Sequence, residues 1–179
     1  MDYLENQGWI EKKYDNLASM YHVSIDGHAR LAALDEPDAR SQMAFVAMWF
    51  NESMNKVWEQ AIQPGIEEAG YEPLRIDRKE HINKIDDEII AELRRARFVV
   101  ADFTHGHDGP RGGVYYEAGF AYGRGVPVIF SCRKDAIDKI HFDTRQYNHI
   151  VWEAGKLDEF RRRLTTRICA VVGDGPRER

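Results

Sequence analysis

The chain has 179 residues, of which 43% are hydrophobic and 31% are charged, a composition that fits one globular domain of moderate size and a small appendage. Its formal net charge of -5 and isoelectric point near 5.8 exclude a general attraction to nucleic acid or to an anionic membrane, so we expect neither as a partner. No apolar run approaches the roughly 18 residues that a membrane-spanning helix needs.

The only two cysteines, Cys132 and Cys169, stand far apart and form no CxxC motif. The N-terminus carries no apolar segment of the kind that directs secretion. Together these features predict a reduced, cytoplasmic protein.

Residues 1–34 differ in pattern from the rest and predict a small α+β appendage. The stretch YLENQGWIEKKY predicts a helix end that runs into a strand, and YHVSIDGHARLAAL predicts a second strand, a turn at Asp26 and Gly27, and a helix. The polar stretch YDNLASM lies between the strands, where a wing would lie. This order resembles the C-terminal half of a winged-helix module, without the helices that normally precede it.

The charge of this part of the chain argues against DNA binding. Residues 1–42 contain eight acidic and four basic residues, and the missing helices include the one that would enter a DNA groove. We therefore expect a structural or dimerising role for the appendage. Residues 35–42, with Pro37 among polar residues, predict the linker to the next domain.

From Met43 onward, apolar strand patterns alternate with helical ones. Ser53 is a predicted helix N-cap, Gly70 a helix stop and Pro64 a site where the helix between them kinks or splits. The predicted strands are 43–50, 71–77, 97–103, 126–132 and 149–152, and the predicted helices are 53–70, 84–96, 114–125 and 156–173.

This alternation predicts a flavodoxin-like, doubly wound α/β domain over residues 43–173, followed by a polar tail at 174–179. We expect a mostly parallel sheet of five strands with helices on both faces. In such sheets, ligands bind beyond the carboxyl ends of the strands. The loops after the first three predicted strands are therefore the place to look for a site.

Those loops are rich in polar and charged side chains. Asp77 and Asp102 end apolar strands, where a carboxylate loses water and needs either partners or a chemical role. Glu117 lies just beyond Gly112 and Gly113, inside an otherwise apolar and aromatic stretch. The residues we expect to line a pocket here are Phe50, Asn51, Ser53, Asp77, Arg78, Lys79, Arg111, Gly113 and Tyr116, together with Asp102 and Glu117.

The segments RFVVADFT and GGVYYEAGFAYGRGVPVIF resemble the nucleoside 2-deoxyribosyltransferase-like family over about residues 43–132. That family has a strand ending in Asp, a variable loop, and a Glu in an E-x-G-x-A helix start. The resemblance implies that Glu117 is a nucleophile for the anomeric carbon of a nucleoside and that Asp102 is a second catalytic acid, as cleavage of an N-glycosidic bond would need. It also implies a homo-oligomer.

Two departures from the family leave transfer and hydrolysis open. Arg111 stands where transferases of the family often have an Asp, and MWFNES replaces the Gly-rich loop of relatives that act on nucleoside 5′-monophosphates. Arg78, Lys79 and Arg111 would bind a phosphate. The expected ligand is a nucleoside, a nucleotide or NAD, and we expect neither a cofactor nor a metal.

Other interpretations remain open at this point. The domain resembles TIR-type NAD hydrolases in its predicted topology, and it would also suit a sensor that binds a nucleotide without cleaving it. The alternative role for Glu117 is that of a helix-start acid, and the alternative role for Asp102 is that of the acceptor in an Asx-turn. Trp49, Trp58 and Trp152 are most simply core residues.

Overall fold

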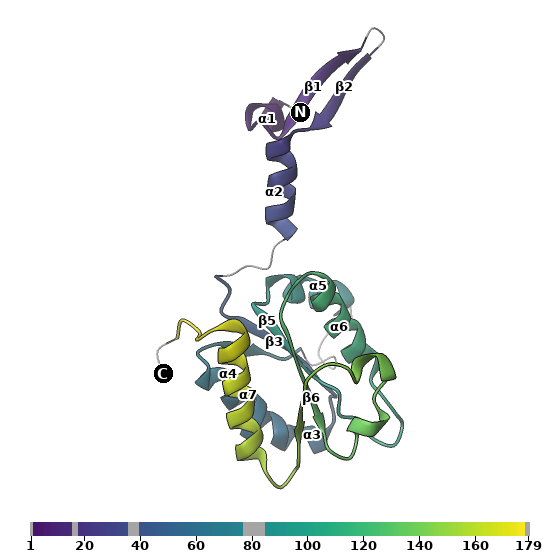
Figure 1. Ribbon diagram of the computed structural model, residues 1–179, viewed down its shortest axis with the longest axis vertical. Coiled ribbons are helices and arrows are strands. Elements are labelled where there is room, and N and C mark those ends of the chain that lie inside the picture. Colours follow the sequence, from purple (N-terminus) through teal and green to yellow (C-terminus); the bar gives the residue numbers. More distant parts are fainter. Residues whose placement is uncertain (1, 16–17, 36–39, 77–84, 178–179) are drawn as a thin grey trace. The chain divides into compact units, whose positions relative to one another are not determined.

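A computed structural model describes residues 2–15, 18–35, 40–76 and 85–177. The chain divides into two compact units, Met1–Glu36 and Pro37–Arg179, shown in Figure 1. Within the described residues, no helix is both long and apolar enough to cross a membrane.

The N-terminal unit contains two short helices and a β-hairpin. Its elements are α1 (Asp2–Asn6), β1 (Ile10–Asp15), β2 (Ala18–Val23) and α2 (Ile25–Asp35). Strands β1 and β2 are antiparallel, with Ile10 opposite Val23. The predicted wing is therefore the far end of this hairpin, and residues 16–17 at its tip lie outside the described residues.

The turn predicted at Asp26 and Gly27 is wrong, because both residues belong to the first turn of α2. The hydroxyl of Ser24 accepts a 2.9 Å hydrogen bond from the Gly27 N–H and so caps the helix. A side chain at Gly27 would collide with the carbonyl oxygen of Trp9. The glycine here thus permits a close backbone approach and does not form a turn.

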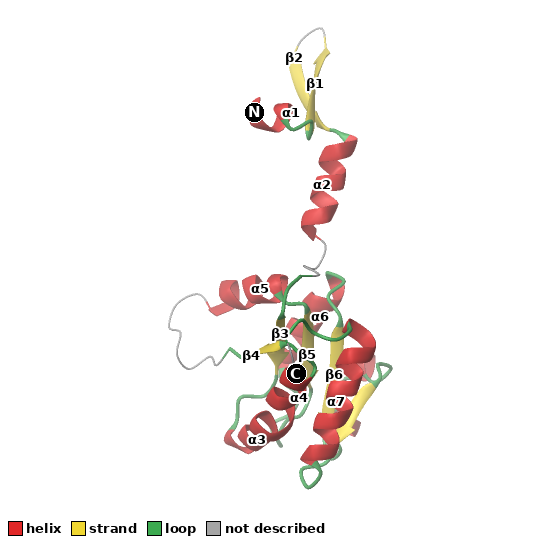
Figure 2. Cartoon of the chain, turned by 90° about the vertical axis from the view of Figure 1, so that its left-hand side faces the viewer, coloured by secondary structure: helices red, strands yellow, loops and turns green. Residues whose placement is uncertain are grey.

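The second unit is a five-stranded sheet with helices on both faces, as predicted, and all of its strands are parallel where a mostly parallel sheet was expected (Figure 2). Its flavodoxin-like fold class is confirmed. The strands are β3 (Met43–Ala47), β4 (Glu72–Leu74), β5 (Phe98–Asp102), β6 (Val128–Arg133) and β7 (His149–Trp152). The helices are α3 (Glu52–Val57), α4 (Gln63–Glu68), α5 (Ile85–Arg95), α6 (Gly112–Gly123) and α7 (Leu157–Val172).

Alternate residues of β3 show how the two faces are covered. Ala44 and Val46 pack in a core with residues of α3, α4 and α7, whereas Phe45 and Ala47 pack with residues of α5 and α6. Successive side chains of a strand point to opposite faces, so a buried central strand is apolar throughout. The continuous apolar run that begins at Met43 follows from this double burial.

The helix that follows β3 is interrupted near Pro64, as the sequence predicts. A π-helical turn, Trp58–Ile62, joins α3 to α4, and Pro64 lies in the first turn of α4. Proline has no N–H and its ring collides with the carbonyl of the preceding turn in a regular α-helix. The wider π-helical turn accommodates this, because π-bulges locally change the spacing of the helical hydrogen bonds.

The order of the strands across the sheet is β4-β3-β5-β6-β7. The chain moves from β3 outward to β4, then returns past β3 to β5 and continues in the other direction. The switch point of this doubly wound sheet therefore lies between β3 and β5, where open α/β sheets bind their ligands.

Candidate functional site

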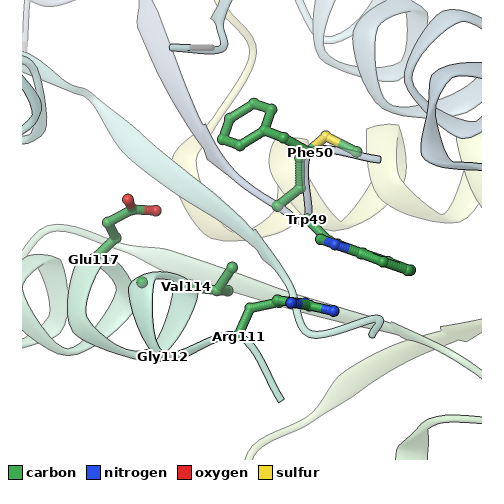
Figure 3. Close-up of a pocket in the computed structure, with 8 residues that line it drawn as sticks. Trp49, Phe50, Arg111, Gly112, Val114 and Glu117 are labelled. Atoms are coloured by element: carbon green, nitrogen blue, oxygen red, sulfur yellow. The ribbon is translucent and has the colours of Figure 1, made fainter. Parts of the chain in front are cut away.

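A cavity of about 340 Å³ opens at this switch point. Its walls come from the segment that follows β3, from the loop before α6 and from the first turns of α6 (Figure 3). Its lining residues are Met48, Trp49, Phe50, Arg111, Gly112, Gly113, Val114 and Glu117. We call this cavity the switch-point pocket.

Trp49 and Arg111 form one side of the switch-point pocket. The Arg111 guanidinium lies 4.6 Å from the centre of the Trp49 ring, and the two side chains run alongside each other in Figure 3. A cation over an indole face is attracted by the electrons of the ring. Gly106 makes room for this ring, because a Cβ there would lie 2.8 Å from the Trp49 side chain.

Arg111 is also paired with Asp108, three residues before it. The hydrogen bond from Arg111 holds the pKa of the Asp108 carboxyl below its ordinary value. The Nε atom of Arg111 is buried and has no hydrogen-bond partner among the described residues. The guanidinium is thus held between a ring and a carboxylate.

The first turn of α6 adds backbone donors to the pocket. Arg111 precedes the helix in an extended conformation, and no side chain caps this end. The N–H groups of Gly112 and Gly113 come before the first hydrogen bond of the helix, which runs from Val114 to the Arg111 carbonyl. Two glycines leave these donors uncovered by side chains at the positive end of the helix dipole.

Glu117 lies on the opposite side of the pocket from Trp49 and Arg111 (Figure 3). It is 7% exposed and belongs to the second turn of α6, whose first turn contains no acidic residue. A helix-start acid would lie in the first turn and face water. The structure therefore does not support that interpretation of Glu117 and places a buried carboxyl group in the wall of a cavity.

Asp102, the predicted partner of Glu117, does not line the switch-point pocket. It is fully buried, and its carboxylate accepts three hydrogen bonds from the Thr104 N–H (3.0 Å), the Ser131 hydroxyl (2.7 Å) and the Trp152 indole N–H (2.8 Å). The bond from Thr104 is that of an Asx-turn. Asp102 thus has a structural role. This corrects the catalytic role that the sequence predicted for it.

Other predicted site residues are also placed elsewhere. Asn51 caps α3 by accepting hydrogen bonds from the Ser53 N–H (3.0 Å) and hydroxyl (2.8 Å). Tyr116 is 61% exposed on α6 and does not line the pocket. Asp77, Arg78 and Lys79 lie outside the described residues. The structure brings together Phe50, Arg111, Gly113 and Glu117 from the predicted set.

The sequence interpretation missed four residues that line the pocket: Met48, Gly112, Val114 and Trp49. Trp49 was expected in the core. It is only partly buried and borders both the pocket and the core. The same segment continues into Phe50, whose ring lies 5.7 Å from the Arg75 guanidinium. A large aromatic residue just beyond the carboxyl end of a strand next to the switch point is the signal that would have identified it.

No protein-family model and no curated protein matches the chain. Among solved structures, it is similar to rubredoxin oxygen:oxidoreductase from the anaerobe Desulfovibrio gigas, with a TM-score of 0.51 and 10% identity over 86% of this chain and 41% of that one. It is also similar to a mutant flavo di-iron protein from Thermotoga maritima, with a TM-score of 0.50 and 10% identity over 83% of this chain and 40% of that one.

The chain spans less than half the length of these two structures. At 10% identity the likeness shows the fold alone, and it is a fold that enzymes use. The similar structures are redox proteins and not glycosidases, so the predicted N-glycosidic cleavage, with its NAD and nucleotide-sensing alternatives, is contradicted and wrong. The resemblances to the transferase-like family and to a winged-helix module, and the homo-oligomer, stay predictions.

Proposed function

We propose that the α/β domain binds a small molecule that carries a flat ring and an anionic group. The observation that carries this proposal is the grouping of Arg111, the uncapped first turn of α6 and the Trp49 ring on one side of a cavity of about 340 Å³. The cavity size suits a ligand of one or two rings.

The anionic group fits the side formed by Arg111, Gly112 and Gly113. Backbone N–H groups at a helix N-terminus bind carboxylates and phosphates, and a guanidinium adds a charge-assisted hydrogen bond. The Arg111 side chain lines the pocket and is 28% exposed, so its guanidinium supplies such a donor.

The ring of the ligand fits between the apolar and aromatic side chains that line the same pocket. Met48, Trp49, Phe50 and Val114 supply these surfaces. Trp49 is held by Arg111 on one side and by the Gly106 loop, so little side-chain freedom is lost when a ligand binds. Preorganised walls of this kind reduce the entropic cost of binding.

Glu117 determines the polarity of the opposite side of the pocket. A buried carboxyl group there favours a ligand that offers an N–H or O–H group. It disfavours a second anionic group, because two buried like charges repel each other. The preferred ligand is therefore polar at both ends, with its anionic group toward Arg111 and its hydrogen-bond donor toward Glu117.

The flavodoxin-like fold suggests flavin mononucleotide as one such ligand, because flavodoxins bind it at the same switch point. The residues after β3 do not fit a phosphate. The side chain of Asn51 already occupies the N-terminus of α3, and Glu52 places a carboxylate in its first turn. The segment after β3 therefore does not fit the phosphate of flavin mononucleotide.

Calorimetric titration with three small benzenes tests the proposal. We expect 4-hydroxybenzoate, which has the ring, the carboxylate and the donor, to bind more tightly than phenol, which lacks the carboxylate, and benzoate, which lacks the hydroxyl. Arg111→Gln should weaken 4-hydroxybenzoate by about tenfold or more, since a hydrogen bond to a charged group contributes about 1.5–3 kcal/mol.

The matched control is Arg94→Gln, which removes an exposed arginine of α5 that does not line the pocket. It should leave the affinity unchanged. Equal affinities for 4-hydroxybenzoate and phenol, or equal losses in the two arginine variants, would contradict the proposal.

A further inference from the structure

A second cavity, of about 300 Å³, lies against a different face of α6. Five of its lining residues are aromatic and one is charged: Phe103, Tyr115, Tyr122, Phe130, Tyr147 and Asp143. None of these residues lines the switch-point pocket. We call this second cavity the aromatic pocket.

The aromatic walls support one another. The Phe130 and Tyr147 rings are stacked with centroids 4.7 Å apart, and Tyr122 meets Tyr147 edge-on at 5.6 Å. Phe103 contacts the Tyr115 ring at 4.7 Å. Rings that pack against each other in this way hold the shape of a cavity before a ligand enters it.

A hydrogen bond joins the loop beside the aromatic pocket to α6. The hydroxyl oxygen of Tyr115 accepts a 2.9 Å hydrogen bond from the His141 backbone N–H. Asp143 follows two residues later, in the 3-10 turn Phe142–Thr144. The bond from His141 therefore ties the loop segment that carries Asp143 to α6, and the Asp143 carboxylate lies 3.3 Å from the His141 ring nitrogen Nδ1.

The charge of the aromatic pocket is the reverse of that near Arg111. Asp143 is the only charged residue among the described residues that line it. Its neighbour Arg145 is directed to the loop itself, because it donates hydrogen bonds to the carbonyls of Ile140 (3.1 Å) and Asp138 (2.6 Å). A carboxylate and several aromatic rings together attract a cation and repel an anion.

Gly119, in the middle of α6, leaves space in the wall of the aromatic pocket. It lines the cavity, and a Cβ built on it would meet nothing within 4 Å. Its backbone is helical, so neither conformation nor close packing requires glycine here, and glycine is less favourable than alanine inside a helix. The space beside Gly119 is therefore open to a ligand in the aromatic pocket.

We propose that the aromatic pocket binds a small amine whose protonated nitrogen lies beside Asp143 and whose flat apolar group packs against the rings. The proposal does not depend on the function of the switch-point pocket, since the two cavities share no lining residue. It assigns to this domain a second ligand, of opposite charge to the first.

NMR titration of the full chain with 2-phenylethylamine, 2-phenylethanol and 3-phenylpropanoate tests the proposal. These probes have the same ring and differ in charge. We expect the amine to bind about tenfold or more tightly than the alcohol, and the carboxylate not to shift the resonances of α6 residues in the aromatic pocket. An alcohol that binds as tightly as the amine would overturn the role of Asp143.

Two pairs of variants locate the site. Asp143→Asn should reduce the affinity for the amine to that for the alcohol. The control is Asp138→Asn, because Asp138 is an exposed carboxylate on the same loop that does not line the pocket. This control should change the affinity for neither probe. Gly119→Leu should abolish binding of both probes by filling the cavity. Gly123→Leu is its control, because a side chain there also meets open space but lies outside the pocket.

Amine binding that persists in Gly119→Leu would overturn the proposal. A loss of amine binding in Arg111→Gln would also overturn it, because the amine would then bind in the switch-point pocket. If Gly119→Leu unfolds α6, the affinity of Asp143→Asn for the amine alone tests the proposal. The Asp143 side chain is 65% exposed and its Oδ2 atom lies 3.3 Å from Nδ1 of His141, so we expect Asp143→Asn to fold, and unchanged amine affinity in this variant would also overturn the proposal.

Discussion

The indole N–H of Trp152 donates a 2.8 Å hydrogen bond to the carboxylate of Asp102, although fifty residues separate the two along the chain. Asp102 ends β5 and Trp152 ends β7, and the Ser131 hydroxyl of the intervening β6 binds the same carboxylate oxygen. One buried side chain thus joins the carboxyl ends of three neighbouring strands.

We predict that Asp102→Ala lowers the free energy of unfolding by about 3 kcal/mol or more, because the donors of Ser131 and Trp152 would stay buried without an acceptor. Trp152→Phe should cost less, since it removes one donor and leaves the carboxylate two others, and since a Phe ring keeps the stack on Phe160. Urea unfolding measures both. A variant Asp102→Ala as stable as the wild type would refute the structural role.

The ion pair between Asp108 and Arg111 competes with any anionic ligand for the guanidinium. We predict that Asp108→Asn strengthens 4-hydroxybenzoate binding by up to about fivefold, since an exposed pair of this kind is worth about 0–1 kcal/mol. Asp135→Asn is the control, because Asp135 forms a similar pair with Arg133, away from the switch-point pocket. Weaker binding in Asp108→Asn would show that the pair positions Arg111 and does not compete for it.

Glu117 should matter only for ligands that offer a hydrogen-bond donor. We predict that Glu117→Gln weakens 4-hydroxybenzoate by about tenfold and leaves benzoate unchanged, because a carboxylate accepts a stronger hydrogen bond than an amide oxygen does. Glu59→Gln, an exposed change in the π-helical turn, is the control. Calorimetry measures the affinities, and equal losses for the two ligands would indicate a general change in the pocket.

The sheet was predictable because apolar residues follow one another with different spacings in strands and in helices. The apolar run from Met43, buried on both faces, and the short HIVW segment, which matches β7, are recognisable without tertiary information. The edge that bears the site follows from the same pattern, because parallel strands that alternate with helices end on one side.

Side-chain direction was not predictable in the same way. Whether an Asp at the end of a strand points toward a ligand or toward neighbouring strands depends for Asp102 on Trp152, which the sequence places fifty residues away. Trp49 continues an apolar run, and the direction of its ring depends on the packing of Arg111 against it. Both depend on contacts between distant segments, which local patterns do not encode.

The two cysteines should differ in reactivity. Cys132 is fully buried in β6, and burial raises the pKa of its thiol to about 12, so almost no thiolate forms at pH 8. We predict that Ellman's reagent labels Cys169 alone in the folded protein and both thiols in 6 M guanidinium chloride. Cys169→Ser should leave the folded protein unlabelled, and rapid labelling of that variant would place Cys132 in contact with solvent.

His149 should make the fold less stable below neutral pH. Its ring lies near the Phe103 and Phe130 rings, with Nδ1 2.8 Å from the Tyr147 carbonyl oxygen, and burial lowers its pKa. The unfolded chain therefore takes up this proton at a higher pH, near 6.5, than the folded chain does. The free energy of unfolding should accordingly fall as the pH drops below about 6.5, and this group contributes no slope above that value. Urea unfolding at pH 7.5 and 5.5 measures this fall in the free energy of unfolding. In the variant His149→Phe, the Phe ring also suits the aromatic surroundings, and we expect a smaller fall between the two pH values. A fall equal to that of the wild type would show that His149 is not the titrating group.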